Sequence, residues 1–345
     1  MRSVLLLFVL CACHHAMPKP PPDPTLERVD VFGSHQLSRE AVLERWGDRL
    51  VALMHATDDN RRPESSALEN QIETEIRKAG SFALVRVSII SYFVPRLTYI
   101  TIDLVDEADR ARRMTFAPAP VGDVPDPDGL LALWDEYQHA AMQLLMDGTI
   151  KPKKEPCPFW HCITFAHESL AKYKDAFAAR VQAHERELAS VLRDDKRANH
   201  RAAAAFLLAH IASGERVVEL MLPSIRDPEE LVRNNAMRVL ALIAADHPEI
   251  AIPLDPVIEA LSFPTTTDRN KASAILDGLT KHGNLSDALR TDIRMRAGSV
   301  LVELLALRQP NNHDFAYKIL KHVSGKDFGE HAIAAWRAWL KDGGR

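Results

Sequence analysis

The chain has 345 residues, of which 46% are hydrophobic and 26% are charged, and its formal net charge is −4 at pH 7. This length and apolar content fit a globular protein of two or three domains and exclude a disordered chain. Acidic and basic residues are intermixed, without a long run of lysine or arginine. We therefore expect no nucleic-acid partner, since a phosphate-binding surface needs clustered positive charge.

The first residues have the pattern of an export signal. Arg2 precedes an apolar run over residues 4–10, which is too short to span a membrane. The run ends in Leu10-Cys11-Ala12-Cys13, which resembles the lipobox of bacterial lipoproteins. The resemblance implies a signal peptide over residues 1–12 and lipidation of Cys13. Simple signal cleavage and an uncleaved start are the alternatives.

A proline-rich linker is expected over residues 13–25, because repeated prolines exclude a helix and favour a semi-rigid spacer. In the lipoproteins of enteric bacteria, an aspartate after the lipidated cysteine signals retention in the inner membrane. This chain has His14 at that place. The resemblance thus implies an exported, periplasmic protein that is anchored by lipid to the outer membrane.

Residues 26–108 are predicted to form a small α+β domain in the order strand, helix, helix, strand, strand. The first strand ends at Gly33, and Ser38 caps the first helix. Ser66-x-x-Glu69 has the pattern of a capping box that would begin the second helix. Alternating apolar residues beyond that helix predict the last two strands.

This element order, together with Val31-Phe-Gly33 and the connection over residues 78–85, resembles the POTRA domain of bacterial envelope proteins. The resemblance implies a protein-docking module whose exposed strand edge pairs with an extended segment of a partner. The alternative is a small domain that only packs against the rest of the chain.

Residues 109–169 are predicted to be a connector. A proline-rich loop leads to an amphipathic helix with Trp134 and Tyr137, whose aromatic stripe we interpret as packing rather than as a ligand site. Cys157 and Cys162 are the only cysteines after the signal region, so in an exported protein we expect a disulfide bond between them. The alternative is a metal or redox site that combines both cysteines with His161 or His167.

Residues 170–345 contain the strongest pattern, which is a helix that follows Asp227 as its N-cap and carries Val232 and Ala236. The alanine recurs 32 residues earlier at Ala204 and 36 residues later at Ala272. An arginine precedes each of these alanines by three residues, at Arg201, Arg233 and Arg269.

Apolar helices also precede the first two copies, so the repeating unit is a helix pair. The signature resembles the HEAT-repeat family in its short bacterial form, which implies an α-solenoid with a C-terminal capping helix. In HEAT-like arrays the arginine bonds to neighbouring carboxylates or carbonyls, so a structural role is the preferred interpretation and anion binding the alternative. A further apolar stripe over Ala297–Leu304 does not fit the period and has no place in the repeat.

No catalytic motif accompanies these patterns. The sequence contains no His-Glu-x-x-His, no Gly-x-Ser-x-Gly and no phosphate-binding glycine loop. We therefore expect a mainly α protein without enzymatic activity, cofactor or metal, which acts as an interaction scaffold for envelope proteins. The solenoid surface and the strand edge of the small domain are the candidate docking sites. The rival hypothesis is a metal-dependent or redox protein built on the segment from Cys157 to His167.

Overall fold

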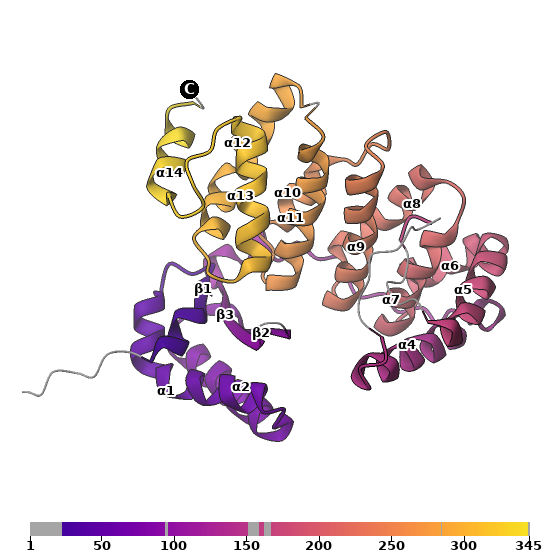
Figure 1. Ribbon diagram of the computed structural model, residues 1–345, viewed down its shortest axis with the longest axis horizontal. Helices are drawn as coiled ribbons and strands as arrows, with labels where there is room; N and C mark the ends of the chain where they lie inside the picture. The colour runs from indigo at the N-terminus through magenta and orange to yellow at the C-terminus, as the bar shows by residue number, and fades with distance from the viewer. Residues whose placement is uncertain (1–22, 94–95, 151–158, 162–166, 284, 344–345) are drawn as a thin grey trace, which may run out of the picture.

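The structure is a computed structural model that describes residues 23–93, 96–150, 159–161, 167–283 and 285–343. Within these residues the protein is mainly helical and contains one small three-stranded sheet (Figure 1). The sheet and two helices form an N-terminal α/β unit. The other helices form an array that curves away from this unit (Figure 1).

The α/β unit has the expected order of elements. It consists of β1 (Val29–Phe32), α1 (Arg39–Asp58), α2 (Arg62–Lys78), β2 (Phe82–Phe93) and β3 (Arg96–Asp106). The strand order is β1-β3-β2, with β1 parallel and β2 antiparallel to the central strand β3. Both β1 and β2 are therefore edge strands in the described part of the sheet.

One of the two predicted helix N-caps in the α/β unit is confirmed and the other is wrong. Ser38 caps α1 as expected, because its hydroxyl accepts the backbone N–H of Ala41. The capping box predicted at Ser66 is wrong, since α2 already begins at Arg62. Pro63 suits the first turn of a helix and Glu64 complements the positive end of the helix dipole, so the chain becomes helical four residues earlier.

The two faces of the sheet differ in polarity because successive strand side chains point to opposite sides. One face carries Val29, Ile100 and Ile102, which pack against α1 and α2 in a separate hydrophobic core. The other face carries Asp30 and Asp103, which are buried although they are charged. This polar face turns toward the helical array.

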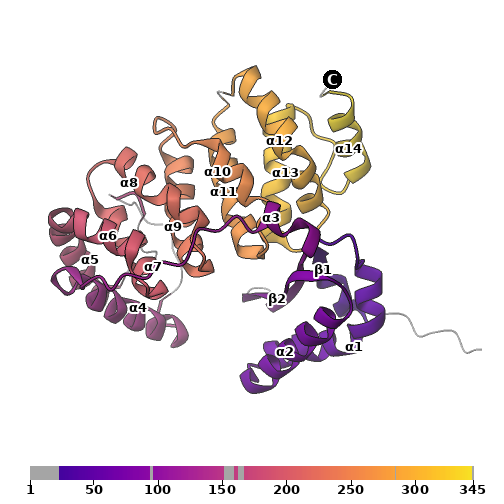
Figure 2. The ribbon, with the colours of Figure 1, turned by 180° about the vertical axis from the view of Figure 1, so that it is seen from behind.

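The chain reaches the array through α3 (Arg110–Arg113) and an extended segment that crosses in front of the helices in the view of Figure 2. Backbone hydrogen bonds fix this segment, from Ala117 to the carbonyl of Arg226 and from Gly122 to the carbonyl of Asp194. The array then consists of α4 (Leu130–Met146), α5 (Glu168–Arg180), α6 (Glu185–Asp194), α7 (Ala198–Leu207), α8 (Gly214–Met221), α9 (Glu230–Asp246), α10 (Leu254–Ala260), α11 (Thr266–Lys281), α12 (Asp287–Leu305), α13 (Pro310–Ser324) and α14 (Ile333–Lys341).

Helices α7, α9, α11 and α13 lie side by side as an inner row, and α4 packs against α7 at one end. Helices α6, α8, α10 and α12 pack against this row from outside. The three repeated alanines, Ala204, Ala236 and Ala272, are buried in the common core, as is Val232. Small residues at these places let neighbouring helices of the inner row approach closely.

The stripe over Ala297–Leu304 belongs to α12, which lies in the outer row and packs against α13 and α14. This position explains why it does not follow the alanine period. The next inner helix is α13, whose Ala316 is buried 44 residues after Ala272. Asp227 is also displaced from its expected place, because α9 begins at Glu230 and Asp227 accepts the N–H of Glu229 before the helix.

Candidate functional site

Arg201 and Arg233 each connect one inner helix to the start of the next. The guanidinium of Arg201 donates two hydrogen bonds to the carboxylate of Asp227, both at 2.8 Å. Arg233 binds Asp268 in the same bidentate way at 2.9 and 2.8 Å. All four groups are buried. Because these side chains are withdrawn from solvent and paired, they fit the structural role and cannot bind a free anion.

Arg269 stands at the third position of this series, but its acidic partner comes from the α/β unit. Its Nη2 lies 2.6 Å from Oδ1 of Asp103 on β3. The other oxygen of Asp103 accepts both the N–H and the hydroxyl of Thr266, each at 3.0 Å. Arg269 and Asp103 are both 0% exposed. The sheet therefore supplies the carboxylate that the following helical repeat would otherwise have to provide.

His313 occupies the corresponding place on α13, three residues before Ala316. Each arginine of the series donates to the carbonyl six residues earlier, for example Arg233 to Asp227 at 2.9 Å. The Nδ1 of His313 lies 3.1 Å from the carbonyl of Leu307, which is also six residues earlier. In α13 a histidine therefore stands at the place that an arginine occupies in α7, α9 and α11.

Asp30 on β1 makes the second junction between sheet and array. Its carboxylate accepts the backbone N–H groups of Arg308 and Gln309, at 2.8 and 3.0 Å. These groups lie just before α13, where the positive end of the helix dipole favours an anion. Burial raises the pKa of Asp30, and these two hydrogen bonds oppose the rise. Both buried aspartates of the sheet are therefore used to hold the helices.

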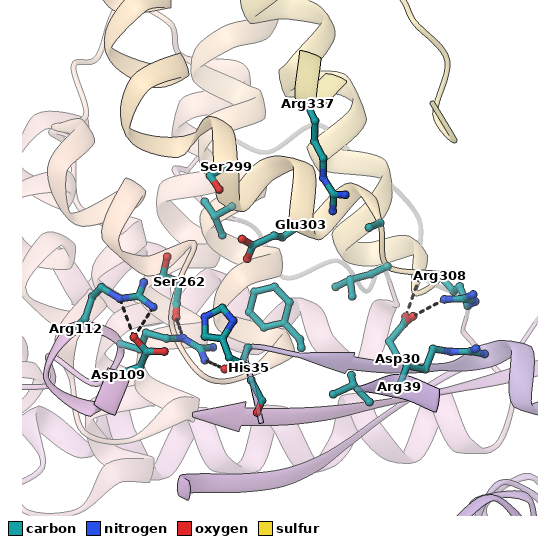
Figure 3. A pocket seen from close by; sticks show the side chains of 18 of the residues that line it. Asp30, His35, Arg39, Asp109, Arg112, Ser262, Ser299, Glu303, Arg308 and Arg337 are labelled. Atoms are coloured by element: carbon teal, nitrogen blue, oxygen red, sulfur yellow. Dashed lines mark hydrogen bonds and ion pairs between the residues drawn. The ribbon is translucent and has the colours of Figure 1, made fainter. Parts of the chain in front are cut away.

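A cleft of about 500 Å³ opens between β1 and the helices α12 and α14 (Figure 3). We call it the junction cleft. Its floor is formed by residues 30–35, and α3 closes one end. Its charged lining consists of the arginines Arg39, Arg112, Arg113, Arg296, Arg308 and Arg337 and the carboxylates Asp30, Asp109 and Glu303.

Some of these charges are compensated within the protein. Arg112 pairs with Asp109 at 2.9 Å, and Arg308 lies 3.5 Å from Asp30. Arg296 pairs with Asp255, outside the cleft, at 2.7 Å. Arg39 lies 3.8 Å from Glu27, which does not line the cleft. These four pairs leave two arginines and one carboxylate of the lining without an ionic partner among the described residues.

Arg113 is the first of the unpaired arginines. It is 3% exposed and donates to the carbonyls of Gly33, Leu104 and Ser262 at 2.6 to 2.9 Å, while its Nη2 has no partner in the described part of the chain. Burial and the nearby charge of Arg269 lower its pKa to about 10. Arg113 therefore keeps its positive charge at neutral pH beside the floor of the cleft.

Arg337 is exposed and reaches from α14 toward the space between α12 and β1, near Glu303 (Figure 3). Neither the side chain of Arg337 nor that of Glu303 forms a hydrogen bond or ion pair with a described residue. The junction cleft therefore carries excess positive charge in a chain whose overall charge is negative.

The outer edge of β1 also faces this cleft. Alternate residues of a strand present their backbone groups to the same side. The carbonyls of Val29 and Gly33 both accept arginine side chains, at 2.7 Å each, rather than pairing with β3. We infer from this alternation that the N–H and C=O of Val31 point away from β3, and Val31 is one of the residues that line the cleft.

The edge of β2 is also partly occupied by side chains, and no residue of β2 lines the junction cleft. The carbonyl of Val85 accepts Arg77 at 3.2 Å, and the N–H of Val87 donates to Glu73 at 2.7 Å. Side chains of α2 thus occupy backbone groups that a pairing strand would need.

The predicted cysteine sites are not part of this geometry. Cys13, Cys157 and Cys162 lie outside the described residues, so lipidation and the disulfide bond stay predictions. His161 packs its ring 4.6 Å from that of Phe206, and burial lowers its pKa to about 3. His167 accepts the N–H of Ser169 at the start of α5. The described residues contain no group of three or more His, Cys, Asp or Glu side chains that could hold a metal ion.

Comparison with known protein families, curated proteins and solved structures gives no match to this chain. Within the described ranges, no helix combines the length and the apolar character needed to cross a bilayer. Function is therefore inferred from the residues of the junction cleft.

Proposed function

We propose that this protein is a non-catalytic interaction scaffold of the bacterial cell envelope that binds an extended, acidic segment of a partner protein in the junction cleft. The feature that supports it most is that Val31, whose backbone groups we infer to face away from β3, lines the same cleft as Arg113 and Arg337, whose side chains have no ionic partner among the described residues. An added strand would pair with the edge of β1, while its acidic side chains would approach the arginines.

In this proposal the helical array is a short α-solenoid with HEAT-like units, and the α/β unit is a POTRA-like domain that closes it. The buried pairing of Arg269 with Asp103 supports this division of roles, because it continues the Arg–Asp series across the junction. Repeat arrays need such an end, since an unpaired terminal unit would leave buried groups without partners.

We place the scaffold on the periplasmic side of the outer membrane, held by a lipid on Cys13. The support is the signal-like run over residues 4–10, the lipobox-like segment that follows it and His14. Mass spectrometry of protein isolated from bacterial membranes tests the anchor. A diacylated Cys13 at the N-terminus is expected, and an unmodified Met1 would contradict it.

The docking site can be tested with a short fluorescent peptide that alternates glutamate with valine. We expect it to bind, and its anisotropy to fall as salt rises, because exposed charge pairs are screened. A peptide with lysine in place of glutamate should not bind. Equal binding of the two peptides would contradict the charge argument.

Two substitutions of opposite sign locate the charge. Arg337→Glu should weaken binding of the acidic peptide by about tenfold, and Glu303→Gln should strengthen it, since a charge-assisted contact contributes about 1.5 kcal/mol or more. Arg294→Glu on the same helix as Glu303 is the matched control, because Arg294 does not line the cleft. If Arg294→Glu and Arg337→Glu weaken binding equally, the peptide binds by general charge and not in the cleft.

Two proline substitutions locate the edge. Val31→Pro removes an outward N–H, and proline is tolerated on an edge strand when the N–H faces away from its neighbour. Ile89→Pro makes the same change at the edge of β2, since Ile89 shares the side of Val85 and Val87. We expect Val31→Pro alone to abolish peptide binding. Loss of binding only in Ile89→Pro would assign the docking site to β2.

A further inference from the structure

A second pocket, of about 380 Å³, lies on the inner row of helices, away from the junction cleft. Helix α4 contributes Trp134 and Tyr137, and α7 contributes Phe206. Helices α9 and α11 contribute Arg238 and Lys271. We call it the aromatic pocket. The remainder of its lining is Gln138, His161, Ala241, Leu242, Ala274 and Phe315.

One wall of this pocket is a cluster of rings. The ring of Trp134 lies 5.4 Å from that of Phe206 and 5.6 Å from that of Tyr137. The ring of His161 lies 4.6 Å from that of Phe206. These contacts agree with the packing role expected for Trp134 and Tyr137, but the same rings also face an open space. Aromatic side chains held in this way form a rigid, flat surface against which a planar group can stack.

The charges of the aromatic pocket are all positive. Its lining contains Arg238 and Lys271 and no aspartate or glutamate. Lys271 donates to the side-chain oxygen of Asn270 at 2.7 Å, and the side chain of Arg238 has no hydrogen bond or ion pair with a described residue. Burial, followed by the charge of Arg238, lowers the pKa of Lys271 to about 8. Two neighbouring cations thus have no anionic partner among the described residues, which is unfavourable unless a bound group compensates their charge.

Tyr137 adds an independent observation. It is 1% exposed, and its hydroxyl has no hydrogen-bond partner in the described part of the chain. Buried hydroxyl groups are nearly always hydrogen-bonded, so an orphaned one in a pocket wall indicates a missing acceptor. Burial raises the pKa of Tyr137, which keeps the hydroxyl protonated and able to donate.

We propose that the aromatic pocket binds a small organic acid that has one carboxylate and a flat, apolar body. The carboxylate lies between Lys271 and Arg238, the body stacks on Trp134 and Phe206, and Tyr137 donates to an oxygen of the ligand. The volume fits this class, since ligand pockets usually begin at about 300 Å³. No atom of the junction cleft takes part, so this site does not depend on the proposed scaffold function.

Calorimetric titration of the full-length protein with 2-naphthoate tests the proposal, with the uncharged 2-naphthamide as its isostere. We expect one site for the acid and at least about tenfold weaker binding of the amide, because the amide cannot compensate the two cations. Equal affinities, or no binding of the acid at millimolar concentration, would overturn the proposal.

Three variants assign the binding to these residues. Lys271→Gln and Arg238→Gln should each weaken binding of 2-naphthoate by about tenfold. Arg294→Gln removes one positive charge from α12, outside the aromatic pocket, and should leave the affinity unchanged. If Lys271→Gln folds with an unchanged circular dichroism spectrum and still binds as the wild type does, the proposed site is wrong.

Discussion

At the residue scale, the junction between the α/β unit and the array depends on Asp30 and Asp103. The partners of these two aspartates cannot be read from the sequence. The pattern Ile100, Ile102, Leu104 predicts a strand and one apolar face, but it says nothing about what Asp103 meets on the other face. The repeated arginines are visible from their spacing, whereas their partners lie 26, 35 and 166 residues away along the chain. An aspartate within an apolar strand indicates that Asp103 has a buried partner, but only the fold identifies that partner as Arg269.

Removal of one partner from the buried pair should be costly. Asp103→Ala leaves Arg269 charged and buried without its carboxylate, and we expect a loss of about 3–5 kcal/mol in the free energy of unfolding. Urea denaturation measures this change. Asp59→Ala removes a carboxylate from an exposed pair with Arg61 and should have little effect. Equal stability of Asp103→Ala and wild type would refute the structural importance of the pair.

Asp195 makes the protein sensitive to acid. Burial alone would raise its pKa, but hydrogen bonds from the side chain and backbone of Arg197, with that residue's charge and the N–H of Val124, lower it to about 2. The folded pKa is below the unfolded value of about 3.9, so the ionised carboxylate stabilises the fold above about pH 4, and this is lost as the pH falls toward 2.

We therefore expect Asp195→Asn to be less stable than wild type at neutral pH, by at most about 2 kcal/mol. The difference should shrink between about pH 4 and pH 2. Urea melts at several pH values measure it. A difference that stays constant down to the acid end would mean that Asp195 is not held ionised by Arg197.

At the element scale, helices with strong periodicity could be predicted and their boundaries often could not. The inner helices α9 and α11 carry the buried alanines expected from the repeat. Helix α13 cannot be predicted from the same pattern. His313 replaces the arginine, and the long outer helix α12 lengthens the interval between Ala272 and Ala316. The start of α2 was misplaced because Ser66 and Glu69 have the pattern of a cap inside a helix that Pro63 had already begun.

The packing of the inner row can be tested at Ala236, which is 0% exposed in α9. Ala236→Asp places an unpaired charge in the core, and we expect a loss of more than about 3 kcal/mol. Thermal melting followed by circular dichroism measures it. Leu231→Asp on the same helix is the control, because Leu231 is 52% exposed and an acidic residue is favourable in the first turn.

A melting temperature of Ala236→Asp close to that of wild type would show that the side chain does not face the neighbouring inner helices. The same would follow if Leu231→Asp were the more damaging of the two substitutions.

At the scale of the whole molecule, the α/β unit and the array are joined by buried polar contacts and by Phe32 of β1, which packs in the hydrophobic core of the array. Asp30 and Asp103 bind the starts of α13 and α11, and the hydroxyl of Tyr92 donates to the side chain of Asn311 at 2.8 Å. The sequence pattern predicts an α/β unit and a helical array but not how the two pack together. Contacts between segments far apart in the chain produce no periodic pattern.

These contacts predict that both parts unfold together. In hydrogen exchange under native conditions, the slowest amides of β3 and α11 should exchange with the same free energy of opening. The reason is that Asp103 on β3 and Arg269 on α11 form a buried ion pair. In Asp103→Ala the amides of β3 should exchange faster than those of α11. Separate opening of the sheet in the wild-type protein would contradict a rigid junction.

Hydrogen exchange of the full-length protein with and without the acidic peptide shows directly which strand edge the peptide binds. If the peptide adds a strand at the junction cleft, amides over residues 29–35 should become protected, and this protection should be absent in Val31→Pro. Protection over residues 85–91 instead, or binding without protection of either edge, would contradict docking at β1.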